Sequence, residues 1–326
     1  MYIEYFLFFI VSLGLTYLVR KLAIKKNIMD NPNERSSHSI PTPRGGGLAI
    51  VIVWFFGLIY LFFNNIIEDH LFYSLLSGML LAVVSFLDDI FDLKPSIRLL
   101  TQAITAGAAL FFLGGFQQNI FDNQIVFIII NVVVFIGLIW FINLYNFLDG
   151  IDGYASQEAI LVAIGMFIIT GDLIFGLLIS SVAGFLIWNW PKAKIFMGDV
   201  GSTQLGFAIA ILGIYVNNTQ ELNIFNWLIL TSVFWFDASF TLFQRWKGKE
   251  KISQAHRKHA YQRLVRGGFS HQKVTILAIF MNIILLSIVI LDTIFIEQSI
   301  VLLGVVIISN LFIYHRINRF FPFDKS

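Results

Sequence analysis

The sequence predicts an all-α, polytopic membrane protein with about ten or eleven transmembrane helices. Of its 326 residues, 57% are hydrophobic and 13% are charged, and the mean hydropathy of +0.79 lies well outside the range of soluble domains. Apolar runs long enough to cross a hydrocarbon core of roughly 30 Å recur along the whole chain. They leave no room for a sizeable soluble domain, so we expect one integral-membrane domain over residues 1–326.

Eleven candidate spans follow one another along the chain. They are residues 3–19, 46–63, 71–87, 99–116, 125–142, 154–170, 173–190, 204–216, 226–242, 274–293 and 299–315. The first run has no basic residue before it and is followed by Arg20 and Lys21. This order is the reverse of a secretory signal, so we expect a first transmembrane helix. The run at 204–216 is short, but a span is required there to place its flanking loops on one side.

The basic residues predict how these spans are oriented. All 22 Lys and Arg residues fall in alternate loops, and the loops between them contain none. By the positive-inside rule, the N-terminus is then outside and the C-terminus is cytoplasmic. The net charge of +2 is too small to indicate a nucleic-acid partner. The absence of cysteine excludes disulfides and thiolate ligands or nucleophiles.

Three acidic motifs lie at the predicted cytoplasmic mouths of the spans. They are FLDDIFD at residues 86–92, NLYNFLDGIDG at 143–153 and FMGDVGS at 196–202. Ionisable side chains at such positions mark, by default, a site where ions or polar substrates are handled. The adjacent carboxylates of Asp88 and Asp89 repel each other unless a cation lies beside them. Mg²⁺ suits that role, because it takes oxygen ligands and leaves positions for substrate phosphates.

Simpler explanations exist for each motif taken alone. The aspartates of the first motif could be a helix-end cluster paired with Lys94 and Arg98. In the second motif, Asp149 and Asp152 would share a helix face, but Asp152 could instead cap the next helix. Asp199 in the third motif could also be an N-cap. Capping explains single residues, whereas it does not explain the whole polar set.

Two basic loops complete the predicted cytoplasmic face. The longest, residues 245–273, contains HRKHAYQ, in which His256 and His259 are three residues apart. This spacing suits a metal ion or phosphate oxygens, and the surrounding positive charge favours phosphate. Taken alone, each histidine is more simply a surface residue. The first loop, DNPNERSSHSIPTPRGGG, adds Arg35, His38 and Arg44, although such a segment could equally be a flexible turn.

These five motifs together resemble the polyprenyl-phosphate N-acetylhexosamine-1-phosphate transferases, the WecA/MraY group of glycosyltransferase family 4. The resemblance covers nearly the whole chain, in the family's order and on its cytoplasmic loops. It implies transfer of a sugar-1-phosphate from a UDP-N-acetylhexosamine to undecaprenyl phosphate, with release of UMP. It also implies Mg²⁺ as the cofactor, with Mn²⁺ as a substitute, and an active site on the cytoplasmic face of the inner membrane.

The resemblance assigns roles to residues of this sequence. Asp199 matches the principal Mg²⁺ ligand, with Asp152 as a second candidate, and Asp88 and Asp89 match the catalytic aspartate pair. His256 and His259 match the histidine motif of the last catalytic loop, which handles phosphate or sugar, and are counted as catalytic. The remaining matches are to substrate-binding positions: Asn143, Asn146 and Asp149 in the nucleotide and metal site, Asn189 and Phe196 in the uridine pocket, and Arg257, with Arg44.

Differences from the family pattern indicate which branch of the family the chain resembles. The muramoyl-pentapeptide branch has adjacent histidines where this chain has HRKHAYQ, and TPTMGG where it has TPRGGG. Both differences favour the branch that initiates O-antigen, teichoic acid or related surface glycans, and they leave the donor sugar open. A homodimer is compatible with the sequence, since nothing distinguishes a lipid-facing span from a dimer face.

Two other functions compete with this one. An intramembrane prenyltransferase could hold an isoprenyl diphosphate through Mg²⁺ on DDIFD, but it would leave FMGDVGS and HRKHAYQ unexplained. An ion-coupled transporter would use carboxylates near the middle of the bilayer. Asp237 is the one plausible mid-span candidate for that use, whereas the other acids cluster at one face.

Overall fold

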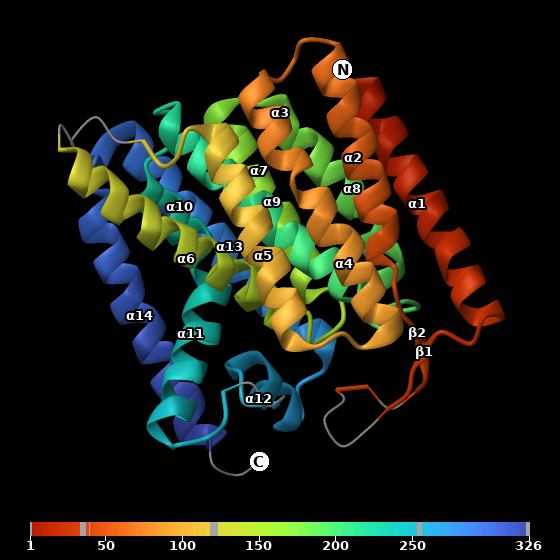
Figure 1. The fold of residues 1–326 in the computed structure, drawn as a ribbon. Helices are drawn as coiled ribbons and strands as arrows, with labels where there is room; N and C mark the ends of the chain where they lie inside the picture. Colours follow the sequence, from red (N-terminus) through yellow and green to blue (C-terminus); the bar gives the residue numbers. More distant parts are fainter. Residues whose placement is uncertain (1, 33–36, 39, 118–122, 253–255, 324–326) are drawn as a thin grey trace.

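The computed structural model describes residues 2–32, 37–38, 40–117, 123–252 and 256–323, and this part of the chain is almost entirely helical (Figure 1). The helices are α1 (Tyr2–Lys25), α2 (Gly47–Phe63), α3 (Asp69–Leu76), α4 (Gly78–Phe91), α5 (Pro95–Leu113), α6 (Gln124–Leu148), α7 (Tyr154–Thr170), α8 (Leu173–Asn189), α9 (Asp199–Asn218), α10 (Ile224–Leu230), α11 (Ser232–Lys247), α12 (Ala260–Arg266), α13 (His271–Leu291), the π-helical turn η1 (Asp292–Ile296) and α14 (Ser299–Phe320). A two-stranded antiparallel ribbon, which the sequence did not predict, joins β1 (Met29–Asp30) to β2 (Thr42–Pro43).

The lengths of the helices confirm the predicted all-α, polytopic membrane fold. Within the described residues, seven helices are long and apolar enough to cross a membrane, or eight if a bent pair counts as one span. The apolar helices α2, α7 and α8 have 17 residues each and accompany them. Each of the eleven predicted apolar runs therefore corresponds to helix in the structure.

One predicted span is sharply bent, and another is interrupted at a single residue but still counts as one span, Asp69–Phe91. The run at 71–87 consists of α3 and α4, which are separated at Ser77, and the run at 226–242 consists of α10 and α11, which meet at an angle of 80° around Thr231. The Ser77 hydroxyl donates to the Ser74 carbonyl at 2.6 Å, and the Thr231 hydroxyl donates to the Trp227 carbonyl at 2.8 Å. Side-chain hydroxyls thus bond to carbonyls of the preceding turn at both breaks, a pattern that bends helices.

Helix α9 lies at the centre of the fold. The sequence predicts this helix only over 204–216. In the structure it begins at Asp199, so the polar turn that precedes the apolar run is also helical. Of its most apolar 18 residues, 89% are buried, and it packs against α2, α4, α6 and α7. A Cβ on Gly47 of α2 would lie only 2.4 Å from the Gly201 Cα. The two backbones therefore approach as closely as small residues allow in membrane helix pairs.

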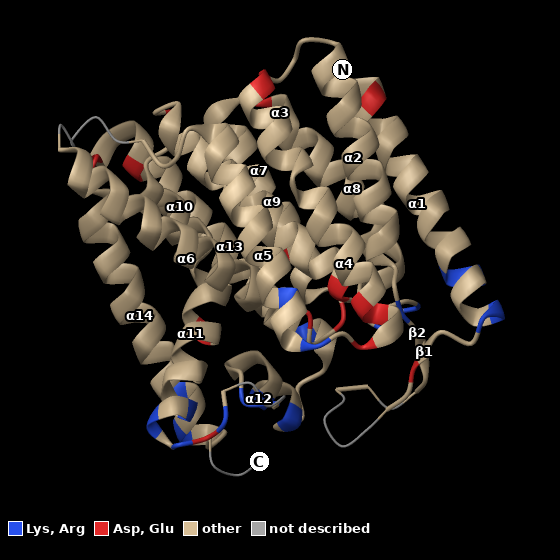
Figure 2. Ribbon diagram, viewed as in Figure 1, with Lys and Arg blue, Asp and Glu red and all other residues tan. Residues whose placement is uncertain are grey.

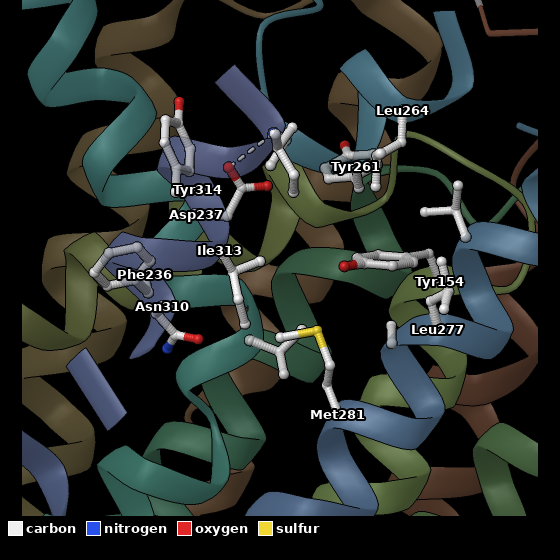
Figure 3. Close-up of a pocket in the computed structure, with 15 residues that line it drawn as sticks. Tyr154, Phe236, Asp237, Tyr261, Leu264, Leu277, Met281, Asn310, Ile313 and Tyr314 are labelled. Atoms are coloured by element: carbon white, nitrogen blue, oxygen red, sulfur yellow. Dashed lines mark hydrogen bonds between the residues drawn. The ribbon is translucent and has the colours of Figure 1, made fainter. Parts of the chain in front are cut away.

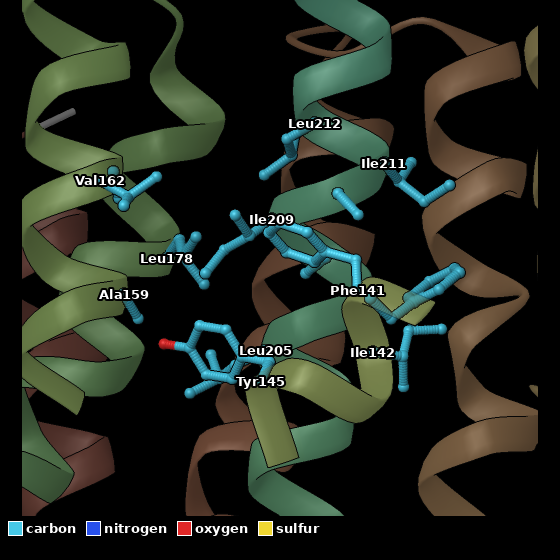
Figure 4. Packing of buried hydrophobic residues seen from close by; sticks show 14 of the residues in the cluster. Phe141, Ile142, Tyr145, Ala159, Val162, Leu178, Leu205, Ile209, Ile211 and Leu212 are labelled. Carbon is cyan, nitrogen blue, oxygen red and sulfur yellow. The ribbon is translucent and has the colours of Figure 1, made fainter. Parts of the chain in front are cut away.

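Side chains from three helices interdigitate around α9 (Figure 4). Phe141 and Tyr145 of α6 lie beside Leu205 and Ile209 of α9, and the Tyr145 hydroxyl donates to the Ala155 carbonyl of α7 at 2.6 Å. All five residues are buried. Because lipid tails are as apolar as these side chains, close packing and internal hydrogen bonds hold such helices together. The start of α9 is therefore fixed by the best-packed part of the molecule.

The charged residues divide the molecule into two ends (Figure 2). Lys and Arg gather at the lower end, around the ends of α1 and α11, the start of α5, and α12. We call this end the basic face. The alternate loops that carry the basic residues thus meet at one side of the helix bundle, and the three acidic motifs end at the same side. The positive-inside rule predicts that the basic face is cytoplasmic.

Candidate functional site at the basic face

A cavity of about 420 Å³ at the basic face is lined by six separate segments of the chain. We call it the polar cavity. Its walls come from the β1–β2 loop, the end of α4, the turn after α6, the segment between α8 and α9, and the first turns of α12 and α13. Seven residues predicted for the site line it: Arg44, Asp89, Asp149, Asp152, Asn189, Phe196 and Asp199. The fold therefore brings together motifs that are up to about half the chain apart.

Asp89 is held by the N-terminus of α9. Its two carboxylate oxygens accept hydrogen bonds from the Asp199 and Val200 N–H groups, each at 3.2 Å. A helix N-terminus has unpaired N–H groups and a partial positive charge, so a carboxylate is stabilised there. Gly198 precedes the helix at φ 78°, and a Cβ on it would lie 2.9 Å from Asp89 Oδ2. Glycine at this position therefore permits both the turn and the contact.

Asp88 points away from the polar cavity and pairs with Arg98 of α5. Its Oδ2 lies 3.1 Å from Arg98 Nη1, and its Oδ1 accepts from the Leu93 N–H at 2.7 Å. Arg98 Nη1 also lies 3.7 Å from Asp199 Oδ2. The ion pair that offered a simpler explanation of this motif is thus present. The same guanidinium also links the first acidic motif to the third.

The two asparagines of the second motif occupy different environments. Asn146 accepts a hydrogen bond from the Ser202 hydroxyl at 2.7 Å, and its side chain also bonds to the Asp199 carboxylate. Asn143 lies one turn earlier in α6 and exchanges hydrogen bonds with Gln102 of α5, at 2.7 and 3.3 Å. Asn146 therefore orients Asp199, whereas Asn143 joins two helices and does not line the polar cavity.

The turn after α6 places Asp149 among other carboxylates. Burial raises the pKa of Asp149 well above its usual range, and the negative charges of Asp199, Asp89 and Asp152 raise it further. The Gly198 N–H bonds to this carboxyl and offsets part of the effect. Like charges in one cavity disfavour ionisation unless a cation is present. The polar cavity thus concentrates negative charge that a divalent cation would neutralise.

Asp152 lies on a second wall of the polar cavity. Its Oδ2 is 3.2 Å from His271 Nδ1 and accepts a hydrogen bond from the Ala193 N–H at 3.1 Å. His271 Nε2 is in turn 3.1 Å from the Ser37 carbonyl oxygen. Asp152 therefore connects the start of α13, the first loop and the segment before α9. Among the described residues, no three His, Asp or Glu side chains are close enough together to hold a metal ion.

Asn189 and Phe196 form the third wall. The buried Asn189 side chain accepts from the Gly153 N–H at 3.0 Å and donates to the Ile195 carbonyl at 3.0 Å. Phe196 is joined to the first loop by main-chain bonds to Pro43 and Gly46, and its ring meets the His38 ring edge to face at 4.8 Å. These contacts leave Phe196 partly exposed in the polar cavity, where a planar ring could stack on it.

The histidine motif lies beside the polar cavity rather than in its lining. His256 and His259 have ring centres 4.8 Å apart, and the buried His259 ring stacks near Tyr261 and Phe147. Burial lowers the pKa of both histidines to about 3, so both rings are neutral near pH 7. Arg257, whose carbonyl accepts from Arg266, does not line the polar cavity either. Of this loop, Gln262 reaches the lining.

A buried carboxylate holds this loop in place (Figure 3). Asp237 of α11 accepts hydrogen bonds from the Ala260 N–H at 2.8 Å and from the Thr241 hydroxyl at 3.1 Å. Figure 3 shows it beside Tyr314 and Tyr261, in a small cavity of about 80 Å³ between α11, α12, α13 and α14. The mid-span carboxylate of the sequence is thus bonded to the first residue of α12. It faces the loop and not a path across the bilayer.

Some lining residues were not predicted from the sequence. Asp30 and His271 are among them. His271 was detectable in principle, because it is a titratable residue at the first turn of a span. Asp30 lies in the first loop, where Arg35, His38 and Arg44 were named from the sequence. His38 and Arg44 line the polar cavity as well, and Arg35 lies outside the described residues. The position of Asp30 depends on the β1–β2 ribbon, which no pattern of two residues can indicate.

The fold and the polar cavity define a polytopic membrane protein with an acidic site at the end of its helices. The chain belongs to glycosyl transferase family 4, whose model matches residues 71–217, a range that includes all three acidic motifs. A relative in Bacillus subtilis (strain 168), named a probable undecaprenyl-phosphate N-acetylglucosaminyl 1-phosphate transferase, is 32% identical over 294 residues, which cover 84% of this chain and 80% of the relative.

Two further relatives indicate the branch of the family. The undecaprenyl-phosphate alpha-N-acetylglucosaminyl 1-phosphate transferase of Yersinia pestis is 26% identical over an alignment that covers 82% of this chain and 78% of the Yersinia chain. The phospho-N-acetylmuramoyl-pentapeptide-transferase of Prochlorococcus marinus (strain MIT 9215) is 27% identical, but that alignment covers only 69% of this chain and 71% of the Prochlorococcus chain. The family predicted from the motifs is therefore confirmed, and the Bacillus and Yersinia transferases match more of the chain than the Prochlorococcus transferase does.

Proposed function

We propose that this protein transfers N-acetylhexosamine-1-phosphate from a UDP-sugar to undecaprenyl or another polyprenyl phosphate. An oxygen of the lipid phosphate attacks the sugar-linked phosphorus of the donor. The bond from that phosphorus to the bridging oxygen breaks, and UMP leaves with the bridging oxygen. The main support is the polar cavity, which collects carboxylates of all three acidic motifs at one end of the helices, in a chain of this family.

The polar cavity suits a diphosphate donor held beside a cation. Asp199, with Asp149 next to it, would hold Mg²⁺ or its substitute Mn²⁺, and Asp152 is the next candidate on the other wall. Carboxylate oxygens are the ligands that these ions prefer, and the mutual repulsion that raises the pKa of Asp149 fits a site for a cation. When bound, such a cation neutralises charge on the donor diphosphate.

The other residues of the site would bind and orient the two substrates. Asn189 and Phe196 form the wall for the uridine, and Arg44 and Arg98 provide positive charge for phosphate oxygens. Asp88 positions Arg98, and Asp89 orients the lipid phosphate. A phosphate monoester is already largely anionic near pH 7, so direct displacement needs little activation. A phospho-enzyme trapped from donor alone would instead indicate an aspartate nucleophile.

The histidine loop acts at the edge of this site. His256 and His259 are neutral near pH 7 because burial lowers their pKa to about 3. They would therefore act as hydrogen-bonding groups toward phosphate or sugar, and Arg257 would supply the charge. Asn143 supports the site through its bonds to α5.

The reaction would take place at the cytoplasmic face of the inner membrane, as the first membrane step of an O-antigen, teichoic acid or similar surface glycan. The basic residues gathered at the site end of the molecule support this orientation. The whole chain would act as one transferase domain, alone or as a homodimer. Transport and prenyl transfer find less support, because the acids gather at one face in a chain of this family.

The reverse reaction gives a direct test. Purified protein should exchange radiolabelled UMP into UDP-N-acetylglucosamine only when both undecaprenyl phosphate and Mg²⁺ are present. A panel of UDP-N-acetylglucosamine, UDP-N-acetylgalactosamine and a UDP-6-deoxy-N-acetylhexosamine would then identify the donor. Failure to exchange with every donor, in protein that remains folded, would contradict the proposed function.

A further inference from the structure

His271 lines the polar cavity but has no part in the reaction proposed above. It is the first residue of α13, and its side chain is 15% exposed. The first turn of a helix favours acidic side chains, and the Ser270 hydroxyl already accepts a bond from the Lys273 N–H there at 3.2 Å. Formation of α13 therefore does not require a histidine at this position.

The two ring nitrogens of His271 reach different parts of the chain. Nδ1 lies 3.2 Å from Asp152 Oδ2, in the turn between α6 and α7. Nε2 lies 3.1 Å from the carbonyl oxygen of Ser37, in the first loop. A carbonyl oxygen can only accept, so Nε2 donates this bond. Ser37 and Asp152 both line the polar cavity, and one imidazole ring thus joins two of its walls.

A second residue of α13 holds the main chain at Asp152. The buried Thr275 hydroxyl, one turn after His271, donates to the Asp152 carbonyl at 3.1 Å. The Asp152 N–H also lies 3.4 Å from His271 Nδ1 and donates to it. The start of α13 therefore contacts the N–H, the carbonyl and the carboxylate of one residue. A side chain on a turn is held precisely when a neighbouring helix supports it in this way.

These contacts leave one oxygen of Asp152 for the polar cavity. Oδ2 receives both the His271 contact and the bond from the Ala193 N–H, at 3.2 and 3.1 Å, whereas Oδ1 takes part in neither. The next residue, Gly153, donates its N–H to Asn189 at 3.0 Å, on the wall proposed for uridine. A displaced Asp152 would therefore disturb the polar cavity at two places.

We propose that His271 is a positioning residue that holds Asp152 and Ser37 in place for binding of the UDP-sugar. The inference rests on the proposed transfer reaction, to which it adds a residue that acts through Asp152 and not on the substrate. Loss of His271 should therefore weaken donor binding more than it slows the chemical step. The lipid phosphate is assigned to Asp89, which is held by α9 instead, so KM for the lipid should not change.

Two isosteric substitutions separate the two contacts of His271. Asparagine places its amide group near the position of Nδ1, and glutamine places its amide group near the position of Nε2. His271→Ala should raise both the Kd for UMP and KM for the UDP-sugar about tenfold, while kcat stays within about threefold. His271→Asn, which keeps the contact with Asp152, should recover most of the UMP affinity, whereas His271→Gln should not.

The exposed neighbour Gln272 supplies the control, and Gln272→Ala should match the wild type in UMP binding and in transfer. Calorimetry measures the Kd for UMP, and melting temperatures in detergent show whether each variant is folded. A lower kcat at unchanged KM for the UDP-sugar in His271→Ala would overturn the inference. Equal loss of UMP affinity in His271→Ala and His271→Asn, at wild-type melting temperatures, would overturn it as well.

The contact with the first loop can be measured without any substrate. The chain has no cysteine, and Ser37 meets His271 through its main-chain oxygen, so Ser37→Cys adds a single thiol and keeps the contact. In detergent, maleimide should label this thiol at least fivefold faster when His271→Ala is also present. The labelling rate should stay unchanged with His271→Gln, which keeps a donor for the Ser37 carbonyl, and with Gln272→Ala.

The labelling result and the transfer reaction can fail separately. An unchanged labelling rate in His271→Ala, or equal acceleration by Gln272→Ala, would overturn the positioning role of His271. Absence of transfer by the wild-type protein would instead reject the proposed function, and the labelling result would stand independently.

Discussion

Gly198 is the residue on which the position of Asp89 depends. It has φ 78°, and a Cβ there would approach Asp89 Oδ2 to 2.9 Å. We expect Gly198→Ala to lower transfer at least 100-fold, because the displaced carboxylate and the strained turn both disturb the site. Steady-state transfer assays on protein with an unchanged detergent-extracted yield provide the measurement.

A second glycine, Gly268, allows the effect of backbone strain to be distinguished from the effect of the contact with Asp89. Gly268 also has a positive φ, of 100°, but nothing lies within 4 Å of the Cβ that alanine would add. Gly268→Ala should therefore show the cost of backbone strain alone and retain most of the activity. If the two variants lost activity equally, the contact between Gly198 and Asp89 would not matter for transfer.

Asp199 is expected to be the main cation ligand. Asp199→Asn preserves size and the N–H that binds Asp89, but it removes the negative charge. We expect kcat to fall by about 10³-fold and the Mg²⁺ concentration for half-maximal rate to rise, in line with the loss of one key electrostatic group. Asp88→Asn should also abolish most transfer without unfolding the protein.

Asp172 supplies the control for these charge changes, since it lies between α7 and α8 at the end opposite the polar cavity. Asp172→Asn should leave kcat and the Mg²⁺ dependence unchanged. Near wild-type turnover by Asp199→Asn at limiting Mg²⁺ would show that the metal assignment is wrong.

Because His259 is buried, we expect the folded protein to lose stability as the pH is lowered. The pKa of His259 is about 3 in the folded protein because it is buried, whereas an unfolded histidine protonates near 6.5. Stability is therefore fully present above pH 6.5 and is lost as the pH falls from 6.5 toward 3, by up to about 1.4 kcal/mol per pH unit. Melting temperatures in detergent should decline less steeply with acid in His259→Gln, and exposed His315→Gln should keep the wild-type slope.

At the scale of elements, α12 is a short helix held from outside itself. Its first N–H is bonded to Asp237 of α11, and the Tyr261 hydroxyl bonds to the Phe147 carbonyl at 2.7 Å. Arg263 donates to Asn318 and to the Phe321 carbonyl near the end of α14, each at 3.0 Å. Seven residues do not form a stable helix alone. Its position, and with it Gln262 in the polar cavity, depends on these three neighbours.

Removal of the Asp237 carboxylate should release α12. We expect Asp237→Ala to raise KM for the UDP-sugar at least tenfold and to increase tryptic cleavage within residues 256–266, because the Ala260 N–H loses its partner. Thr241→Val removes only a neutral hydroxyl beside Asp237 and should stay within about threefold of the wild type. Identical kinetics for Asp237→Ala and the wild type would show that α12 is held by its other contacts.

The helical elements were predictable to different degrees. Long apolar runs such as those of α6 and α14 leave no alternative to a membrane helix, and their positions agree with the structure. The interruption at Ser77 and the bend at Thr231 were not predictable, because each lies inside an unbroken apolar run of the sequence. The start of α9 was missed because its first turn is polar, and its helical state depends on packing against α2 and α4.

At the scale of the whole molecule, the motifs predicted which loops meet, but not which side chains face the polar cavity. Asp89 lines it and Asp88 does not, although they are adjacent, because helix geometry directs one toward α9 and the other toward Arg98. His256 and His259 followed the family motif, yet neither lines the polar cavity, whereas Gln262 does. Such differences depend on tertiary packing, which spacing in the sequence does not encode.

The orientation of the molecule can be measured with single cysteines. In intact cells, a membrane-impermeant maleimide should label Asn65→Cys and Gln220→Cys, which are exposed at the end away from the basic face. It should label Lys192→Cys and Lys249→Cys, which are exposed at the basic face, only after the cells are permeabilised. The opposite pattern would place the polar cavity outside the cytoplasm and would contradict the positive-inside assignment.

The hydrogen bonds between Asp89 and α9 also determine whether mutations can affect Asp199 without affecting Asp89. The donors at the start of α9 are main-chain N–H groups, so exchange of the side chain at position 199 or 200 leaves them in place, and only proline removes a donor. Side-chain changes at Asp199 therefore affect that carboxylate and its contacts with Arg98 and Asn146, and they leave the hydrogen bonds to Asp89 in place. Suppressor mutations of an Asp199 defect should accordingly arise among the residues around this carboxylate and not at the main-chain contact with Asp89.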